Sequence, residues 1–167
     1  MAWCKRQAAR ARKLARLAWR DMLLLTEAWL TLVWVDLVIS FTPYRRWRHW
    51  LQLQAPELAQ RDVANACAVN ESMQRRAEHI IRLSEVAARN HLRTMNCLRR
   101  TLAQQRLLSR RHVATRVHIG VRKSESTLEA HAWLSAQSSV LNDTADVGNR
   151  YAELQADQWG RISRFID

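Results

Sequence analysis

The spacing of the apolar side chains changes once along this chain, and that change constrains the fold more than any other feature. Over residues 57–90, and again over 97–109, apolar residues recur at the three- and four-residue intervals of a helix. Over 117–121 and 128–134 they alternate with polar residues, which predicts two strands. Helices followed by a small antiparallel sheet predict an α+β fold.

The N-terminal region is strongly helical by composition. Residues 5–40 contain no Pro or Gly, and Pro43 ends the helix that they predict. The run 22–41 is apolar on most sides, so it needs cover from the rest of the chain or from another protein. Glu27 and Asp36 lie within that run, and each would cost about 2.5–3.5 kcal/mol at mid-bilayer. A helix that faces a partner or lies on a membrane surface is therefore favoured over one that spans a bilayer.

Charge and tryptophan content divide the chain near Pro56. Residues 1–53 carry ten basic and three acidic residues and six of the eight tryptophans, and they end in a short basic amphipathic segment, 44–53. We therefore predict a helical, basic, Trp-rich arm over 1–53, which could associate with a membrane surface, and a body over 54–167. The tryptophans are most simply core or interface anchors.

Arginine dominates the charge of the chain. There are 27 basic residues, only three of them Lys, against 15 acidic ones, for a net charge of +12. This balance points to an acidic or phosphate-bearing partner, although a solvated helix surface explains the central arginines equally well. No nucleic-acid-binding motif and no interleaved aromatic residues accompany them, so nucleic acid is not an expected partner. The central arginines are Arg75, Arg76, Arg82, Arg89, Arg93, Arg99, Arg100, Arg106, Arg110 and Arg111.

The cysteines are odd in number and widely spaced. Cys4, Cys67 and Cys97 cannot build a disulfide framework, so a reducing cytoplasm fits best. The histidines lack ligand partners at metal-binding spacing, and the three glycines are too far apart to form a phosphate loop. Neither a metal nor a cofactor is therefore expected. Cys4 and Cys67 have no evident chemical role.

A thiol, an imidazole and a carboxylate remain as candidates for catalysis. Cys97 would begin a helix, capped by Thr94 or Asn96, and the unpaired backbone N–H groups there stabilise a thiolate. His131 lies in the polar register of its predicted strand, so it could meet a helix packed on that side of the sheet. Asp143 is the candidate that would orient the imidazole.

The choice of Asp143 depends on the register of a third strand, predicted over 140–143. If the preceding hairpin loop is centred on Ser138, Asp143 is a diagonal neighbour of His131, at about 7–8 Å. A two-residue loop at Ser138-Ser139 would instead set His131 against Asp146. Asn142 is a weaker candidate, because an amide can also orient the imidazole of a thiol protease.

The local motifs around these residues resemble a known family. Over about residues 94–154 the chain is similar to the transglutaminase-like leader peptidases of lasso peptide biosynthesis. The resemblance rests on Asn96-Cys97-Leu98-Arg99-Arg100-Thr101-Leu102, Gln105-Arg106-Leu107-Leu108, Val117-His118-Ile119-Gly120-Val121, His131-Ala132-Trp133-Leu134 and Val140-Leu141-Asn142-Asp143. The segment Pro43-Tyr44-Arg45-Arg46 also resembles the one that precedes this core in the family.

The resemblance implies a papain-like, transglutaminase-like core in which Cys97 is the nucleophile, His131 the base and Asp143 the orienting carboxylate. It implies a cysteine protease that removes the leader from a ribosomally made lasso precursor peptide, so that a partner lasso cyclase can close the ring. A separate leader-recognition protein is expected, because residues 1–53 are too short, helical and glycine-free to form the recognition domain. An acyltransferase and a basic, non-catalytic scaffold are the alternatives.

The chain also departs from the family pattern at two places. Many relatives have Pro before the catalytic Cys-Leu, where this chain has Asn96. Many have Gly in the turn after the cysteine helix, which here reads Arg110-Arg111-His112-Val113. These changes leave the three candidate catalytic residues in place and bear on how the substrate fits.

Overall fold

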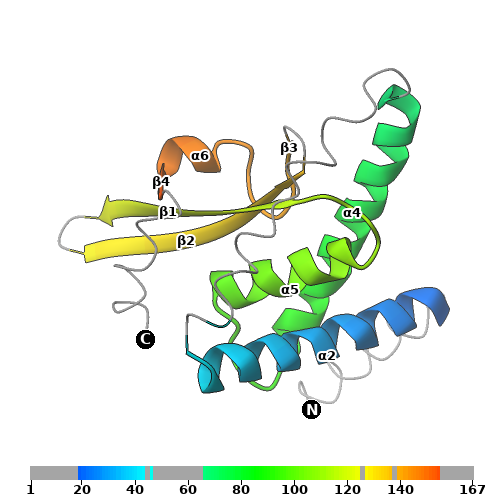
Figure 1. Ribbon diagram of the computed structural model, residues 1–167, viewed down its shortest axis with the longest axis horizontal. Helices are drawn as coiled ribbons and strands as arrows, with labels where there is room; N and C mark the ends of the chain where they lie inside the picture. The colour runs from blue at the N-terminus through cyan, green and yellow to red at the C-terminus, as the bar shows by residue number, and fades with distance from the viewer. Residues whose placement is uncertain (1–18, 44–45, 47–65, 125–126, 137–138, 155–167) are drawn as a thin grey trace, which may run out of the picture.

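The computed structural model describes residues 19–43, 46, 66–124, 127–136 and 139–154. Among these residues three long helices come first, and a four-stranded antiparallel sheet follows with the order β3-β2-β1-β4 (Figure 1). This arrangement confirms the predicted α+β fold. The elements are α2 (Trp19–Phe41), α4 (Ala66–Arg89), α5 (Cys97–Ser109), β1 (Arg116–Ser124), β2 (Thr127–Ala136), β3 (Ser139–Val140), α6 (Val147–Arg150) and β4 (Ala152–Glu153).

Helix α2 packs one side against α4 and α5 and leaves the other side exposed. Ala28, Leu32 and Val35 are buried at helical spacing, so the body of the protein covers this face. The helix ends at Phe41, two residues before Pro43, because Pro disfavours helical geometry in the residue before it. By length and composition alone, α2 is the one helix of the described residues that could cross a membrane.

A buried carboxylate anchors α2 to the body. Asp36, on the covered side of the helix, is 6% exposed. Its Oδ2 accepts a hydrogen bond from Arg93 Nη1 at 3.1 Å, and its Oδ1 lies 2.9 Å from Arg99 Nε. A buried carboxylate needs such cationic partners, so this contact holds α2 beside the start of α5.

Helix α5 begins and ends where its sequence predicts. Of the two expected caps, Asn96 is the observed one: its side chain accepts a hydrogen bond from the Arg99 N–H at 2.9 Å. The turn after the helix contains His112 at φ 57°, a left-handed conformation that favours glycine. His112 therefore adopts, in this turn, a backbone conformation that a glycine would adopt more easily.

The sheet has a covered face and a face that carries the candidate base. In the β1–β2 ladder Ile119 pairs with Ala132, and these residues belong to the core with α5. Gly120 pairs with His131 on the opposite face. The expectation that His131 meets the cysteine helix on its own side is wrong: α5 packs on the other face, and the short α6 lies on the side opposite to α5 (Figure 1).

The third strand is shorter than predicted, and its register differs from both predicted alternatives. Ser135 pairs with Val140 and Ala136 with Ser139, so the strand ends at Val140. The Leu141 N–H still donates to Leu134 O at 2.9 Å, after which the chain bends through residues 141–143. That bend, not a strand register, determines where Asp143 lies.

Several predictions fall outside the described residues. These are the part of the first helix before Trp19, the segment 44–53 apart from Arg46, the beginning of the second helix over 57–65, and the environment of Cys4. Cys67 lies in α4, but its side chain is also outside what the structure describes.

Candidate active site

Cys97 is the first residue of α5 and lies at an edge of β2. Strand β3 pairs only with the end of β2, so among the described strands the earlier part of β2 has no neighbour on that side. Cys97 and Thr101 are one helical turn apart and share the side of α5 that faces this edge. Cys97 Sγ lies 4.0 Å from the carbonyl oxygen of Ala130, and Thr101 Oγ1 donates to Ala132 O at 3.1 Å.

The structure brings His131 and Asp143 together. His131 Nε2 lies 2.5 Å from Asp143 Oδ2. The other carboxylate oxygen, Oδ1, accepts hydrogen bonds from the Thr144 N–H at 2.7 Å and from Arg150 Nη2 at 2.9 Å. Burial would raise the pKa of Asp143, but the hydrogen bonds from His131 and Thr144 and the charge of Arg150 outweigh it and lower the pKa. Asp143 is therefore well suited to stay ionised and hold the imidazole.

The other candidates for the orienting group lie elsewhere. Asp146 Oδ2 pairs with Arg150 Nε at 3.3 Å, so it supports the same arginine that contacts Asp143. The Asn142 side chain points to α5 and β2: its Oδ1 accepts from the Leu134 N–H at 2.7 Å, and its Nδ2 donates to Gln104 Oε1 at 2.8 Å. Neither side chain makes a hydrogen bond to His131 in the described part of the chain.

The Asn142 contacts belong to a buried polar network that joins both halves of the site. Gln104 is 1% exposed and donates to Glu85 of α4 at 2.7 Å, while Arg100 donates to the same carboxylate at 2.9 Å. Thr101 accepts from Asn142 Nδ2 at 3.2 Å. The network thus connects the cysteine helix to the bend that carries Asp143. The sequence signal for it is the polar residues at 101 and 104, which lie among the mostly apolar buried positions of α5.

Aromatic rings surround the imidazole. The centroid of the His131 ring lies 5.0 Å from that of Tyr151 and 6.2 Å from that of Trp133. Gly120, across the ladder from His131, leaves room for these rings: a Cβ there would lie 2.7 Å from Tyr151 Cβ and 2.9 Å from Trp133 Cη2. Sequence reasoning did not identify this role of Gly120, although its position in the Ile-Gly-Val motif opposite His131 was a usable signal.

The thiol and the imidazole do not share a hydrogen bond in this structure. Among the described residues, the polar contact of Cys97 Sγ is the carbonyl of Ala130, the residue before His131. His131 uses Nε2 on Asp143, so Nδ1 is the nitrogen that could accept the thiol proton. Such contacts often tighten only when substrate binds. The thiol lies beside the open edge of β2, at the Ala130 carbonyl, and the next residue of that strand, His131, carries the imidazole on the face opposite to α5.

Groups that could bind a metal are absent from the described residues, since no cluster of three His, Cys, Asp or Glu side chains forms there. A thiol at a helix start and a carboxylate-bound imidazole are the groups used by enzymes that form a thioester intermediate.

Comparison with known families assigns the fold. The family model of the Transglutaminase-like superfamily matches residues 38–156, a segment that includes Cys97, His131 and Asp143. The chain therefore belongs to the Transglutaminase-like superfamily, which supports chemistry of the cysteine-protease or acyltransferase type. Comparisons with curated proteins and with solved structures found no match.

Proposed function

We propose that this protein is a cysteine peptidase that removes the leader from a lasso peptide precursor. The observation that carries the proposal is the position of the His131 imidazole. Its ring is bound to the Asp143 carboxylate, and the carbonyl of the preceding residue, Ala130, lies beside Cys97 Sγ. The resemblance of the motifs around Cys97, His131 and Asp143 to those of the leader peptidases supports the choice of substrate.

The reaction follows from the chemistry of these groups. His131 takes the proton of the Cys97 thiol, and the thiolate attacks the carbonyl carbon of the peptide bond at the leader–core junction. The C–N bond breaks as the imidazolium gives its proton to the leaving nitrogen, which frees the core peptide with an α-amine. Water then hydrolyses the thioester and releases the leader. Asp143 holds the imidazole throughout and stabilises its protonated form.

The start of α5 supplies donors for the oxyanion of the tetrahedral intermediate. The Arg99 N–H is bonded to the Asn96 side chain, and the Arg100 N–H to the Asn96 carbonyl. The N–H groups of Cys97 and Leu98 are the backbone donors that remain at this helix start for the substrate. One such donor contributes about 2.7–4 kcal/mol in other proteases.

The proposed function involves two partner proteins, one before cleavage and one after it. A separate leader-recognition protein would hold the precursor, since residues 1–53 include the long helix α2 and contain no glycine. A lasso cyclase would then join the new α-amine to an Asp or Glu side chain of the core.

Mass spectrometry of the cleavage products tests the proposal. The precursor peptide is incubated with this protein and the recognition protein, and separate leader and core fragments are expected. Cys97→Ala should abolish the fragments without loss of leader binding, whereas the matched control Cys67→Ala should retain cleavage. Asp143→Asn should lower the cleavage rate strongly, and full activity of that variant would refute the role of Asp143.

The same assay distinguishes hydrolysis from acyl transfer. A small primary amine is added over a range of concentrations, and the mass of the leader fragment is measured at each. A free carboxyl terminus on the leader supports the peptidase. A leader fragment that carries the amine even at low amine concentration would show that the enzyme is an acyltransferase, because only the second nucleophile differs.

A further inference from the structure

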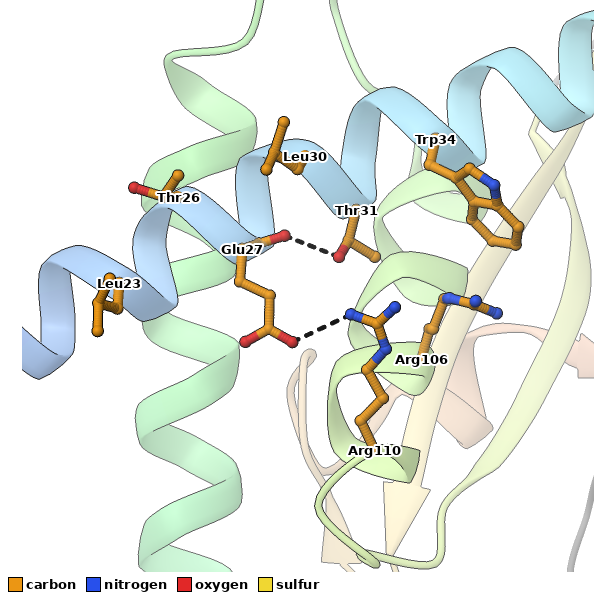
Figure 2. A pocket seen from close by; sticks show the side chains of 8 residues that line it. All are labelled: Leu23, Thr26, Glu27, Leu30, Thr31, Trp34, Arg106 and Arg110. Atoms are coloured by element: carbon orange, nitrogen blue, oxygen red, sulfur yellow. Dashed lines mark hydrogen bonds and ion pairs between the residues drawn. The ribbon is translucent and has the colours of Figure 1, made fainter.

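The exposed side of α2 forms a groove with the C-terminal end of α5, away from the candidate catalytic residues. The groove has a volume of about 500 Å³. Figure 2 shows Leu23, Leu30 and Trp34 projecting from α2, and Arg106 and Arg110 approaching from the end of α5. Leu23 is 60% exposed and Leu30 57% exposed, so the apolar surface is open to solvent.

The cations of the groove are not balanced by its single carboxylate. Glu27 accepts hydrogen bonds from Arg110 at 3.2 Å and from Arg111 at 2.5 Å, so one negative charge serves two guanidinium groups. The guanidinium of Arg106 lies 4.0 Å from the centre of the Trp34 ring and pairs with no carboxylate of the described residues. Burial, and then the charge of Arg110, lower the pKa of Arg106. An anion placed beside Arg106 would favour its charged form and so counteract both effects.

We propose that this groove binds an acidic amphipathic segment of a partner protein. The apolar side chains of that segment pack on Leu23 and Leu30, and its carboxylates pair with Arg106 and Arg110. The charge of the groove selects the occupant, because an apolar floor beside unbalanced arginines favours a ligand that offers both apolar surface and negative charge.

Two other occupants fit the groove less well. The N-terminal segment 1–18 of the chain itself has six basic residues and no acidic one, so it would be repelled by Arg106 and Arg110. A membrane surface is flat on this scale, whereas the groove is hollowed between two helices, which suits a protein segment better.

Fluorescence anisotropy tests the proposal with the full-length protein. The probe is a labelled, helix-forming synthetic peptide with a leucine stripe flanked by glutamates, and the control peptide has glutamine in place of each glutamate. Arg106→Gln should weaken binding of the glutamate peptide by about tenfold, which corresponds to about 1.4 kcal/mol, because it removes a charged hydrogen bond. The matched surface change Arg75→Gln, on α4 and outside the groove, should change it by less than about twofold.

Leu30→Ser, at an exposed position, provides a second variant that removes apolar contact without removing charge. Leu30→Ser should also weaken binding of the glutamate peptide. Circular dichroism of each variant checks that the fold is retained. Equal weakening by Arg75→Gln, equal binding of the glutamine peptide, or no binding to the full-length protein would each overturn the proposal. Binding to phosphatidylserine–phosphatidylcholine vesicles is measured as well. If vesicle binding depends on Arg106 and Leu30 while peptide binding does not, the proposal is also overturned, because the groove would then belong to a membrane-binding surface.

Discussion

Replacing Asn142 by alanine should destabilise the protein substantially, because its side chain supplies hydrogen bonds to buried groups. The change leaves the Leu134 N–H without its acceptor and Gln104 Oε1 without its donor. Leu134 and Gln104 are 0% and 1% exposed, so both groups lie in the interior of the protein. An unsatisfied buried group costs about 1–3 kcal/mol. With partial relaxation of the bend, we expect a loss of about 2–4 kcal/mol in the free energy of unfolding.

Urea denaturation followed by tryptophan fluorescence measures this loss. The midpoint should fall while the dependence on urea concentration stays unchanged, which indicates a change in stability alone. Asn149→Ala is the matched control: it makes the same chemical change at an exposed position of α6 and should alter stability by no more than about 0.5 kcal/mol. An Asn142→Ala effect as small as that of the control would refute the reasoning, since the network would then contribute nothing measurable.

Three further perturbations test other parts of the structure. Gly120→Ala forces its Cβ against Trp133 and should cost about 1–3 kcal/mol, measured as a lower Tm; an unchanged Tm would contradict the close packing. Asp36→Ala leaves Arg99 without its buried partner and should cost about 3 kcal/mol in urea denaturation, whereas a loss below about 1 kcal/mol would show that the ion pair is dispensable. The hydrogen bond from Arg111 lowers the pKa of Glu27, so the stability from this carboxylate is present above its unfolded value of about 4.3 and is lost as the pH falls through the lowered pKa. Stability curves measured down through that range should be flatter for Glu27→Gln than for the natural protein, and parallel curves would refute the assignment.

Local signals in the sequence were sufficient for much of the fold. Asn96 caps α5 because a side-chain oxygen can satisfy a free N–H at a helix start, and that needs only neighbouring residues. The strands β1 and β2 follow from the alternation of apolar and polar residues, which depends on the period of an extended chain. Cys97 is therefore placed at the start of a helix, and His131 on a strand, by short-range physics.

Longer-range features could not be predicted in the same way. Alternation along β2 separates His131 from Ala132, but it does not say which face the helices will cover. The predicted register of β3 was wrong. Its ladder has only two residue pairs, which is too short to hold the chain that follows in strand register. The Leu134 N–H donates its hydrogen bond to the side chain of Asn142 and not to the backbone of a longer β3. The chain bends away from the strand at this point.

The sequence by itself determined the α+β order, the limits of α5 and the strand that bears His131, since these depend on capping and on periodicity within single elements. Only the tertiary structure decided that Asp143 contacts the imidazole, that α5 packs on the face opposite to His131, and that the exposed side of α2 forms a groove with Arg106. The physical reason is that these contacts join residues distant in the chain. Their geometry depends on how whole elements pack, and no local preference encodes it.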